Sequence, residues 1–215
     1  MKLAELRAQV VNYCRRLAQS DLSIGTTGNI SAIDQEESLI AISPGAMDYG
    51  SMEAADVVLL NLQGEVVDGE RRPSSEWAMH LGCYAQRADI GAIVHTHSPA
   101  ATTLAVLGQE LPAVHYMIAL SGGGTIPLAP YHTYGTAALA QAAVAAMGAG
   151  HACLLQNHGV LAAGPDLAWA WSLAEQVEFC ADIYLRASAV GEPEILSQSQ
   201  IEEVIEQLDA YRAQH

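Results

Sequence analysis

The stretch GAIVHTHSPAATTLAVL, residues 91–107, decides how this 215-residue chain is expected to fold. Residues 91–97 predict a buried strand, and the remainder predicts a helix that runs to Leu107. His95 and His97 are two positions apart, and side chains with that spacing on a strand point to the same face. The sequence therefore predicts a strand that presents two imidazole nitrogens together.

Further strands and helices are expected on both sides of this unit. Strands are predicted over 29–33, 38–42, 56–62, 65–67 and 125–130, and as a pair broken near Gly159 over 151–164. Helices are predicted over 3–17, 135–147, 167–188 and 200–211, and after two N-cap candidates, Ser74 and Ser75. Strands grouped with helices between and around them, in partly antiparallel order, predict an α/β sandwich with a mixed sheet. Neither a repeat nor a polar linker divides the sequence, so we expect one domain over 1–215.

The composition excludes several functions. With 9 Lys and Arg against 24 Asp and Glu, the formal charge is −15, which repels nucleic acid and acidic membrane surfaces. The one lysine is Lys2, near the N-terminus, so a mechanism through a buried lysine Schiff base is excluded. Residues 111–165 carry no charged side chain, but glycines and prolines interrupt them, and we expect them to be buried in protein rather than in a membrane. Four widely spaced cysteines without a C-x-x-C pair, and an N-terminus unlike a signal peptide, indicate reduced thiols in a cytoplasmic protein.

A third histidine and a carboxylate extend the pair on the strand. His158 lies in LLQNHG, at the end of another predicted strand that could adjoin the first. Three histidines leave an open coordination position, as in a catalytic zinc site, whereas the alternative is a set of separately hydrogen-bonded histidines. Glu76, in PSSEW, could act beside such a metal, or its segment could simply cap a helix.

Two loops offer neutral hydrogen-bond donors. GTTGNIS, residues 25–31, combines glycines with hydroxyl and amide side chains, and Ser43 and Gly45 flank a proline; each segment could equally be a turn. Anion donors, a metal with a free position and a carboxylate together indicate chemistry on a small phosphorylated compound. The metal would polarise a carbonyl, and the carboxylate would move a proton.

These motifs follow a known order. GTTGNIS, SPGAMDYG, PSSEW, VHTHS, HYMIALSGGGTIPLAPYHTYGT and LLQNHG resemble the successive motifs of the class II aldolase and adducin family, over about residues 1–190. The match is closest to members that cleave L-fuculose 1-phosphate. The resemblance implies an α/β/α sandwich around a nine-stranded, mixed and largely antiparallel sheet. It also implies a fourfold homotetramer, with active sites between subunits and one Zn²⁺ in each, although another divalent metal is possible.

The resemblance also assigns roles to positions of this chain. It implies that the metal ligands are His95, His97 and His158, and that Glu76 is the acid/base and a possible additional ligand without substrate. The implied phosphate pocket comprises Thr26, Gly28, Asn29, Ser43, Gly45, Ser74 and Ser75.

Other positions carry over less directly. Tyr116 matches a tyrosine that reaches a neighbouring active site, and Tyr211 resembles a second tyrosine in the C-terminal tail. The chain departs from the pattern of the members that cleave L-fuculose 1-phosphate at three positions. Ser43 stands where those members have threonine, Tyr134 where they have phenylalanine, and His132 where they have a small residue. The last two departures bear on the choice of aldehyde.

The implied reaction is the reversible cleavage of a ketose 1-phosphate to dihydroxyacetone phosphate and a short aldehyde. Candidate substrates are L-fuculose 1-phosphate and a deoxy or methylthio pentulose 1-phosphate. Alternatives within the family are a methylthioribulose-1-phosphate dehydratase and an L-ribulose-5-phosphate 4-epimerase, but the latter places an aspartate where this chain has Glu76. A non-enzymatic alternative is an adducin-like assembly module, which would need neither the histidines nor the glutamate.

Overall fold

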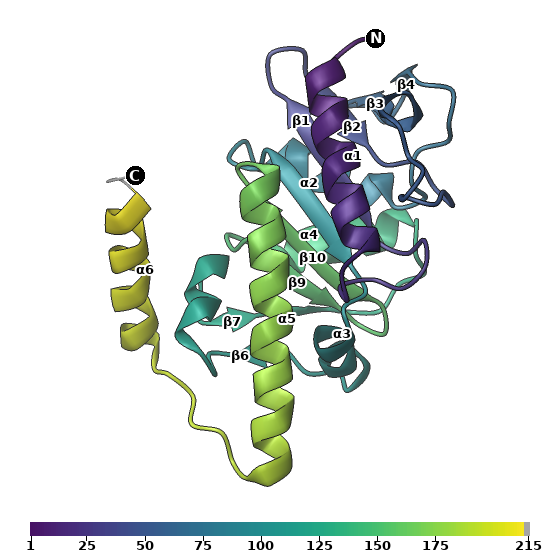
Figure 1. The fold of residues 1–215 in the computed structure, drawn as a ribbon. Helices are drawn as coiled ribbons and strands as arrows, with labels where there is room; N and C mark the ends of the chain where they lie inside the picture. Colours follow the sequence, from purple (N-terminus) through teal and green to yellow (C-terminus); the bar gives the residue numbers. More distant parts are fainter. Residues whose placement is uncertain (213–215) are drawn as a thin grey trace.

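The central element of the fold is an eight-stranded sheet. A computed structural model describes residues 1–212, and Figure 1 shows the sheet with helices packed around it. The strand order is β4-β3-β2-β1-β5-β10-β9-β8, antiparallel throughout except for the parallel pair β8 and β9. The strands are β1 (Asn29–Asp34), β2 (Leu39–Ile42), β3 (Val58–Asn61), β4 (Val66–Asp68), β5 (Ala92–Thr96), β8 (Leu128–Ala129), β9 (Ala152–Leu155) and β10 (Gly159–Gly164). The mixed, largely antiparallel sheet is confirmed.

The expected strand count of nine is wrong: the central sheet of the described chain has eight strands. Two short strands, β6 (Leu111–Pro112) and β7 (Thr125–Ile126), pair only with each other. The expected single strand over 125–130 is therefore two strands in different sheets. Pro127 separates them because it has no N–H to continue a ladder, while its carbonyl accepts a hydrogen bond from Leu154 N at 2.8 Å.

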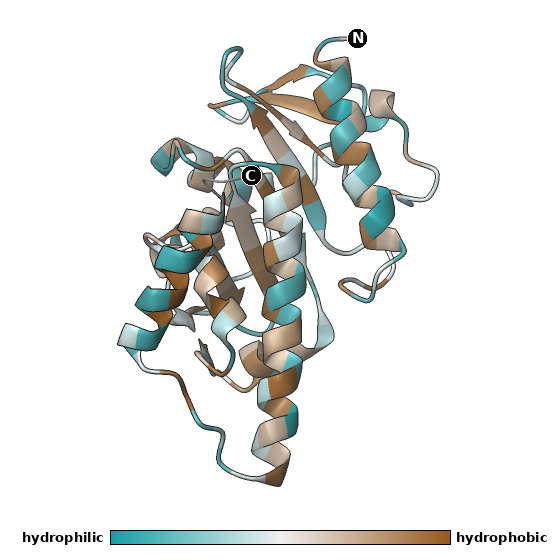
Figure 2. Ribbon diagram, turned by 60° about the vertical axis from the view of Figure 1, so that its left-hand side comes forward, coloured by the Kyte–Doolittle hydropathy of each residue, from teal (hydrophilic) through white to brown (hydrophobic). Residues whose placement is uncertain are grey.

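Helices cover both faces of the sheet. The α-helices are α1 (Ala4–Ala18), α2 (Trp77–Gln86), α3 (Pro99–Val106), α4 (Ala137–Met147), α5 (Leu167–Val190) and α6 (Gln198–Arg212), and the 3-10 helices are η1 (Ala54–Asp56) and η2 (Tyr116–Ser121). Helices α1, α3 and α5 share one buried cluster with one face of the sheet, and α2 and α4 share a second cluster with the other face. On β5, Ala92 and Val94 belong to the first cluster and Ile93 to the second, as the period of two requires. Figure 2 shows the apolar strands enclosed by helices with mixed polar and apolar surfaces. This is the predicted α/β sandwich.

The start of α2 lies later than expected. Ser74 and Ser75 were expected to cap it, but the helix begins at Trp77, and Glu76 occupies the N-cap position without a capping side-chain bond. Ser74 instead closes a preceding turn, in which its hydroxyl accepts from Glu76 N at 3.3 Å and its carbonyl from Trp77 N at 3.2 Å. A bridge between Pro44 and Pro73 holds the chain extended just before this turn, which delays the helix. The delay leaves the Glu76 side chain free to face the sheet.

The uncharged segment 111–165 contributes strands to the core. All residues of β9 and β10 are buried. None of the helices in residues 1–212 combines the length and apolar character that a membrane crossing requires. The four cysteines are free and buried.

Candidate active site

Three histidines converge at one end of the central strands. His95 lies on β5, His97 follows the end of that strand, and His158 lies in the turn between β9 and β10. Because β10 pairs directly with β5, this turn is brought beside the two β5 histidines. Each pair of imidazole rings has centroids 4.9 Å apart, at interplanar angles of 75°, 80° and 79°. The predicted convergence of the three side chains is therefore present, and the Nε2 atoms of His95 and His97 lie 3.1 Å apart.

Two of these rings are neutral at physiological pH, and the third has its Nδ1 fixed by a hydrogen bond. His95 Nδ1 lies 2.8 Å from the carbonyl oxygen of Val160 and donates to it, which leaves a lone pair on Nε2 in the neutral ring. Burial, reinforced by the charge of the neighbouring histidines, lowers the pKa of His97 to about 3 and that of His158 to about 4. Both rings are therefore neutral at physiological pH and can offer a lone pair.

Glu76 completes the cluster from the other side. Its Oε2 lies 3.0 Å from His95 Nε2 and accepts a hydrogen bond from Asn29 Nδ2 at 3.1 Å, and its Oε1 lies 3.2 Å from His158 Nε2. Burial alone would raise the pKa of Glu76, but the charge and hydrogen bond of His95, with His158 and Asn29, outweigh it and hold the pKa below its ordinary value. Burial would likewise lower the pKa of His95, and the negative charge of Glu76 reverses that effect. The carboxylate is thus ionised and only 7% exposed.

The donor set fits a divalent cation. One ligand atom from each of Glu76, His95, His97 and His158 lies within 4.8 Å of the others. Three imidazole nitrogens and a carboxylate oxygen are the ligands that zinc accepts in catalytic sites. Oε1 of Glu76 is buried and accepts no hydrogen bond from the described residues, and two Nε2 atoms face each other at 3.1 Å. A shared cation would satisfy all of these atoms at once, with Glu76 as the additional ligand expected when no substrate is bound.

A cleft of about 380 Å³ opens in front of the cluster. Its lining includes six of the seven predicted phosphate-pocket residues: Thr26, Gly28, Asn29, Gly45, Ser74 and Ser75. Gly28 has a φ of +79°, and a Cβ there would lie 2.7 Å from the carbonyl oxygen of His95, so close approach requires glycine. Neither Lys nor Arg occurs among the described lining residues. A phosphate in this cleft would depend on hydroxyl and amide donors.

Ser43, the seventh residue, lies behind the cleft rather than in its lining. Its side chain is fully buried, and its hydroxyl oxygen accepts from Ile30 N at 3.2 Å and from the Tyr49 hydroxyl at 3.1 Å. Four further lining residues were not among the sequence-based candidates: Ala46, Tyr49, Tyr131 and Asn157. Asn157 has a φ of +54° in the tight turn before His158, and an Asn beside the histidine and Gly159 was the available signal.

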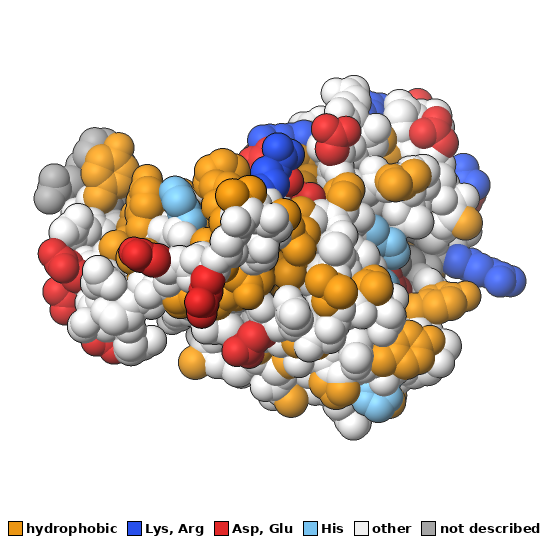
Figure 3. Space-filling model, turned by 90° about the horizontal axis from the view of Figure 1, so that it is seen from below, with side chains coloured by type: hydrophobic (Ala, Val, Ile, Leu, Met, Phe, Trp, Pro, Cys, Tyr) orange, Lys and Arg blue, Asp and Glu red, His pale blue; other side chains and the backbone are white. Residues whose placement is uncertain are grey.

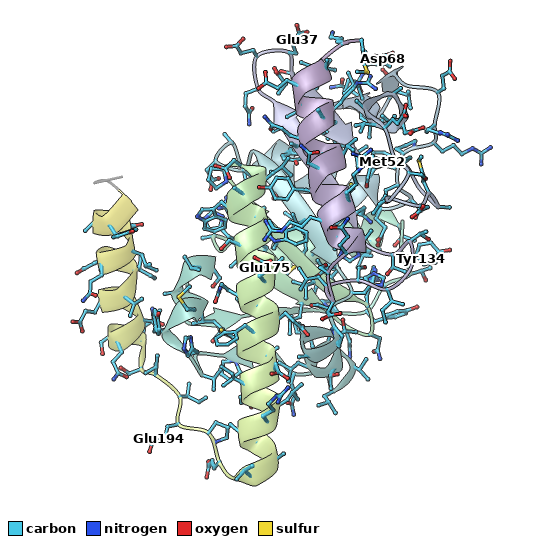
Figure 4. All side chains as sticks on the ribbon, viewed as in Figure 1. Glu37, Met52, Asp68, Tyr134, Glu175 and Glu194 are labelled. Carbon is cyan, nitrogen blue, oxygen red and sulfur yellow. The ribbon has the colours of Figure 1, made fainter. Side chains whose placement is uncertain are left out.

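The aromatic residues fall into two groups. Tyr131, His132 and Tyr134 line the cleft. Tyr116, on η2, and Tyr211, on α6, are 50% and 62% exposed and are not among the lining residues. Figure 4 labels Tyr134 on the opposite side of the molecule from α6. Within one chain the structure therefore does not bring Tyr211 to the histidines.

The fold and the cluster place the chain among α/β proteins with a three-histidine, one-carboxylate site suited to a metal ion. The chain belongs to the class II aldolase and adducin family: residues 8–185 match the family described as Class II Aldolase and Adducin N-terminal domain.

Several known proteins are similar to the chain over nearly its whole length. It is 46% identical to a protein of Bacillus thuringiensis serovar kurstaki named 5-deoxy-D-ribulose 1-phosphate aldolase, over 100% of both chains. It is 41% identical to a 5-methylthioribulose-1-phosphate/5-deoxyribulose-1-phosphate aldolase of Rhodospirillum rubrum, over 96% of this chain and 92% of the relative. A solved structure titled L-fuculose 1-phosphate aldolase superimposes with a TM-score of 0.95 at 43% identity, covering 97% of this chain and 98% of the other.

Proposed function

We propose that the protein is a metal-dependent aldolase that reversibly cleaves a ketose 1-phosphate to dihydroxyacetone phosphate and a short aldehyde. The observation that carries this proposal is the position of Glu76, an ionised carboxylate within 3.0–3.2 Å of two imidazole nitrogens at the base of a cleft. The relatives named above act, by their names, on 5-deoxyribulose, 5-methylthioribulose and L-fuculose 1-phosphates. The dehydratase, epimerase and adducin-like alternatives are not favoured by these relatives.

We assign the substrate phosphate to the hydroxyl side chains that line the cleft, where Thr26, Ser74 and Ser75 provide donors. We assign the aldehyde portion to Tyr131, His132 and Tyr134, which line the same cleft. The ring carbons of these three side chains offer apolar contact that suits a deoxy or methylthio group. This supports 5-deoxyribulose 1-phosphate as the first substrate to test.

The proton transfer is assigned to Glu76. In the condensation direction its ionised carboxylate accepts a proton from the hydroxymethyl carbon of dihydroxyacetone phosphate, and in the cleavage direction it returns one to that carbon. Oε1 is the oxygen available for this transfer, because Oε2 accepts from Asn29. A divalent cation held by the three histidines supplies, when bound, Lewis-acid polarisation of the substrate carbonyl. We propose Zn²⁺ as that cation, one per subunit.

We further propose that the active enzyme is a cytoplasmic homotetramer with its active sites between subunits. Tyr116 and Tyr211 are exposed and lie outside the cleft of their own chain, so in such an assembly they could complete a neighbour's site. Large apolar side chains, among them Val106, Leu107 and Phe179, are also exposed. Figure 3 shows apolar side chains spread over one face of the molecule. Four free cysteines support a reducing compartment.

The test is to incubate the purified protein with dihydroxyacetone phosphate and acetaldehyde, lactaldehyde or methylthioacetaldehyde. We expect new ketose 1-phosphates by mass spectrometry, with acetaldehyde accepted, and loss of all products when a chelator is added. A preparation that holds stoichiometric metal yet forms no product with any of the three aldehydes would contradict the proposed function.

A further inference from the structure

A chain of buried polar side chains leads from Glu76 into the layer between β1 and α2. It joins Glu76, Asn29, His80, Ser31 and Tyr84 in that order, through hydrogen bonds of 3.1, 2.6, 2.7 and 2.7 Å. We propose that His80, supported by Ser31 and Tyr84, is a positioning residue that fixes the Asn29 amide and, through it, the Glu76 carboxylate. This inference rests on the proposed function, because it assigns the proton transfer to Glu76.

The two elements present these side chains in register. Glu76, His80 and Tyr84 are four residues apart along α2 and its N-cap, a spacing that puts them on one face of the helix. Asn29 and Ser31 are two apart on β1 and share one face of the strand. None of the five residues is more than 7% exposed. Water therefore does not compete with the hydrogen bonds between them.

The direction of every hydrogen bond follows from the ionised carboxylate. Glu76 can only accept, so Asn29 must point its Nδ2 toward Glu76 and its Oδ1 toward His80. Burial lowers the pKa of His80 to about 3, and the ring is therefore neutral with a single N–H. That proton must lie on Nε2 to donate to Asn29, which leaves Nδ1 to accept from the Ser31 hydroxyl. Ser31 in turn accepts from the Tyr84 hydroxyl.

Loss of His80 would remove the constraint on the Asn29 amide. An amide flipped by 180° would turn its oxygen against the carboxylate oxygen of Glu76, which is repulsive. Without the Nε2–H donor, neither amide orientation is held and the carboxylate loses its fixed donor. We therefore expect the proton-transferring oxygen of Glu76 to be poorly oriented, while the protein still binds metal and substrate.

The variants His80→Leu and His80→Gln test this role. Leucine removes both nitrogens, whereas the glutamine amide keeps a donor for Asn29 and an acceptor for Ser31. We expect His80→Leu to lower kcat by at least about tenfold with KM for dihydroxyacetone phosphate within about threefold and metal content unchanged. We expect His80→Gln to recover most of the lost kcat.

Two further variants keep the test decisive. Cys83→Ala, on the same helix and equally buried, is outside the chain of bonds and should lower the melting temperature without lowering kcat. Tyr84→Phe keeps the ring and removes one hydroxyl, and should lower kcat about threefold even if His80→Leu does not fold. An unchanged kcat in Tyr84→Phe, or equal losses in both His80 variants that follow the melting temperature, would overturn the proposal.

A readout without turnover separates this proposal from the proposed function. ¹⁵N NMR of histidine-labelled protein should show one ring in the Nε2–H form that is absent from the spectrum of His80→Gln. If the ring that is missing from the His80→Gln spectrum is instead in the Nδ1–H form, the proposal is overturned even in an active enzyme. An inactive protein with the Nε2–H form would refute the aldolase function and retain the hydrogen-bond order.

Discussion

At the residue scale, the ionised state of Glu76 results from three neighbours, two imidazoles and one amide. His95 and His158 supply imidazole nitrogens at 3.0 and 3.2 Å, and Asn29 supplies an amide donor. Burial by itself would favour the neutral carboxylic acid, so these neighbours decide that the group stays ionised. One oxygen of this buried carboxylate is fixed by a donor, and the other has no hydrogen bond in the described chain. The carboxylate is therefore suited to accept a proton at the second oxygen.

We expect Glu76→Gln to lower kcat by about 10²–10⁴-fold, because the amide cannot accept the proton. Three histidine ligands remain, so metal content should be near one per chain and binding of dihydroxyacetone phosphate should be retained. Steady-state kinetics and metal analysis measure the two effects. The control is Glu194→Gln, which changes an exposed carboxylate on the segment before α6. A kcat for Glu76→Gln equal to that of the control would assign the proton transfer to another group.

His80 makes the stability of the metal-free protein depend on pH. Its pKa is lowered from 6.5 to about 3 in the folded chain, first by burial and then by the charge of His95. Below pH 6.5 the unfolded chain therefore binds a proton that the native chain does not, and stability is lost as the pH falls from 6.5 toward 3. Between pH 7.5 and 5 the wild type should lose about 2 kcal/mol more than His80→Gln. Urea unfolding at both pH values measures this difference, and equal losses would contradict it.

At the element scale, the sequence predicted the strands better than the segments between them. The apolar residues before His95 predicted β5 as a buried strand, and a run of apolar residues predicted β9 and β10. The split at Pro127 could not be predicted, because it depends on which strand each half meets in the folded chain. The start of α2 depended on the bridge between Pro44 and Pro73, which joins segments remote in sequence.

The site shows the same division between local and long-range information. The spacing of His95 and His97 predicted their shared direction, the local sequence offered His158 and Glu76 as candidates beside them, and the resemblance assigned their roles. The hydrogen bonds of the Ser43 hydroxyl with Ile30 and Tyr49 could not be predicted, since they arise from packing between β1 and a loop. The position of His80 on the same helix face as Glu76 could be predicted, because it lies four residues after Glu76. Its hydrogen-bond partners could not, because they lie on another element.

The contact between β5 and β10 can be tested at Gly159. A Cβ at this position would lie 2.2 Å from the carbonyl oxygen of Thr96 and 3.0 Å from Cδ2 of His97. Gly159→Ala should therefore push β10 away from β5 beside the metal ligands, costing about 1–3 kcal/mol of stability and lowering metal content. Urea unfolding and metal analysis measure both. Gly191→Ala is the control, because no described atom lies within 4 Å of a Cβ there.

At the scale of the whole molecule, the proposed metal is expected to serve catalysis and not folding. The two buried clusters on either side of the sheet form without reference to the histidines, which lie at the end of the strands. Chelation should therefore abolish activity while the circular dichroism spectrum and the molecular mass in solution stay unchanged. Zn²⁺ added back should restore activity. Dissociation or unfolding on chelation would show that the metal is structural.

The proposed assembly predicts that two inactive variants can complement each other. If Tyr116 acts in a neighbour's site, a site needs Glu76 from one subunit and Tyr116 from the next. Glu76→Gln and Tyr116→Phe chains, each with low activity alone, would then form some intact sites when refolded together.

Random mixing in equal amounts in a ring places an intact Glu76 beside an intact neighbouring Tyr116 at about one quarter of the sites. We therefore expect about a quarter of wild-type kcat per chain in the mixture, against the low sum of the two separate variants. Mixing the folded homotetramers without refolding is the control, and it should give no gain while subunits do not exchange. No gain in refolded hybrids whose mixed composition is verified by native mass spectrometry would mean that both residues act within one chain. Wild-type kcat in Tyr116→Phe alone would mean that Tyr116 has no part in the reaction. The first of these outcomes would conflict with the position of Tyr116, which is half exposed on η2 and outside the cleft lining of its own chain.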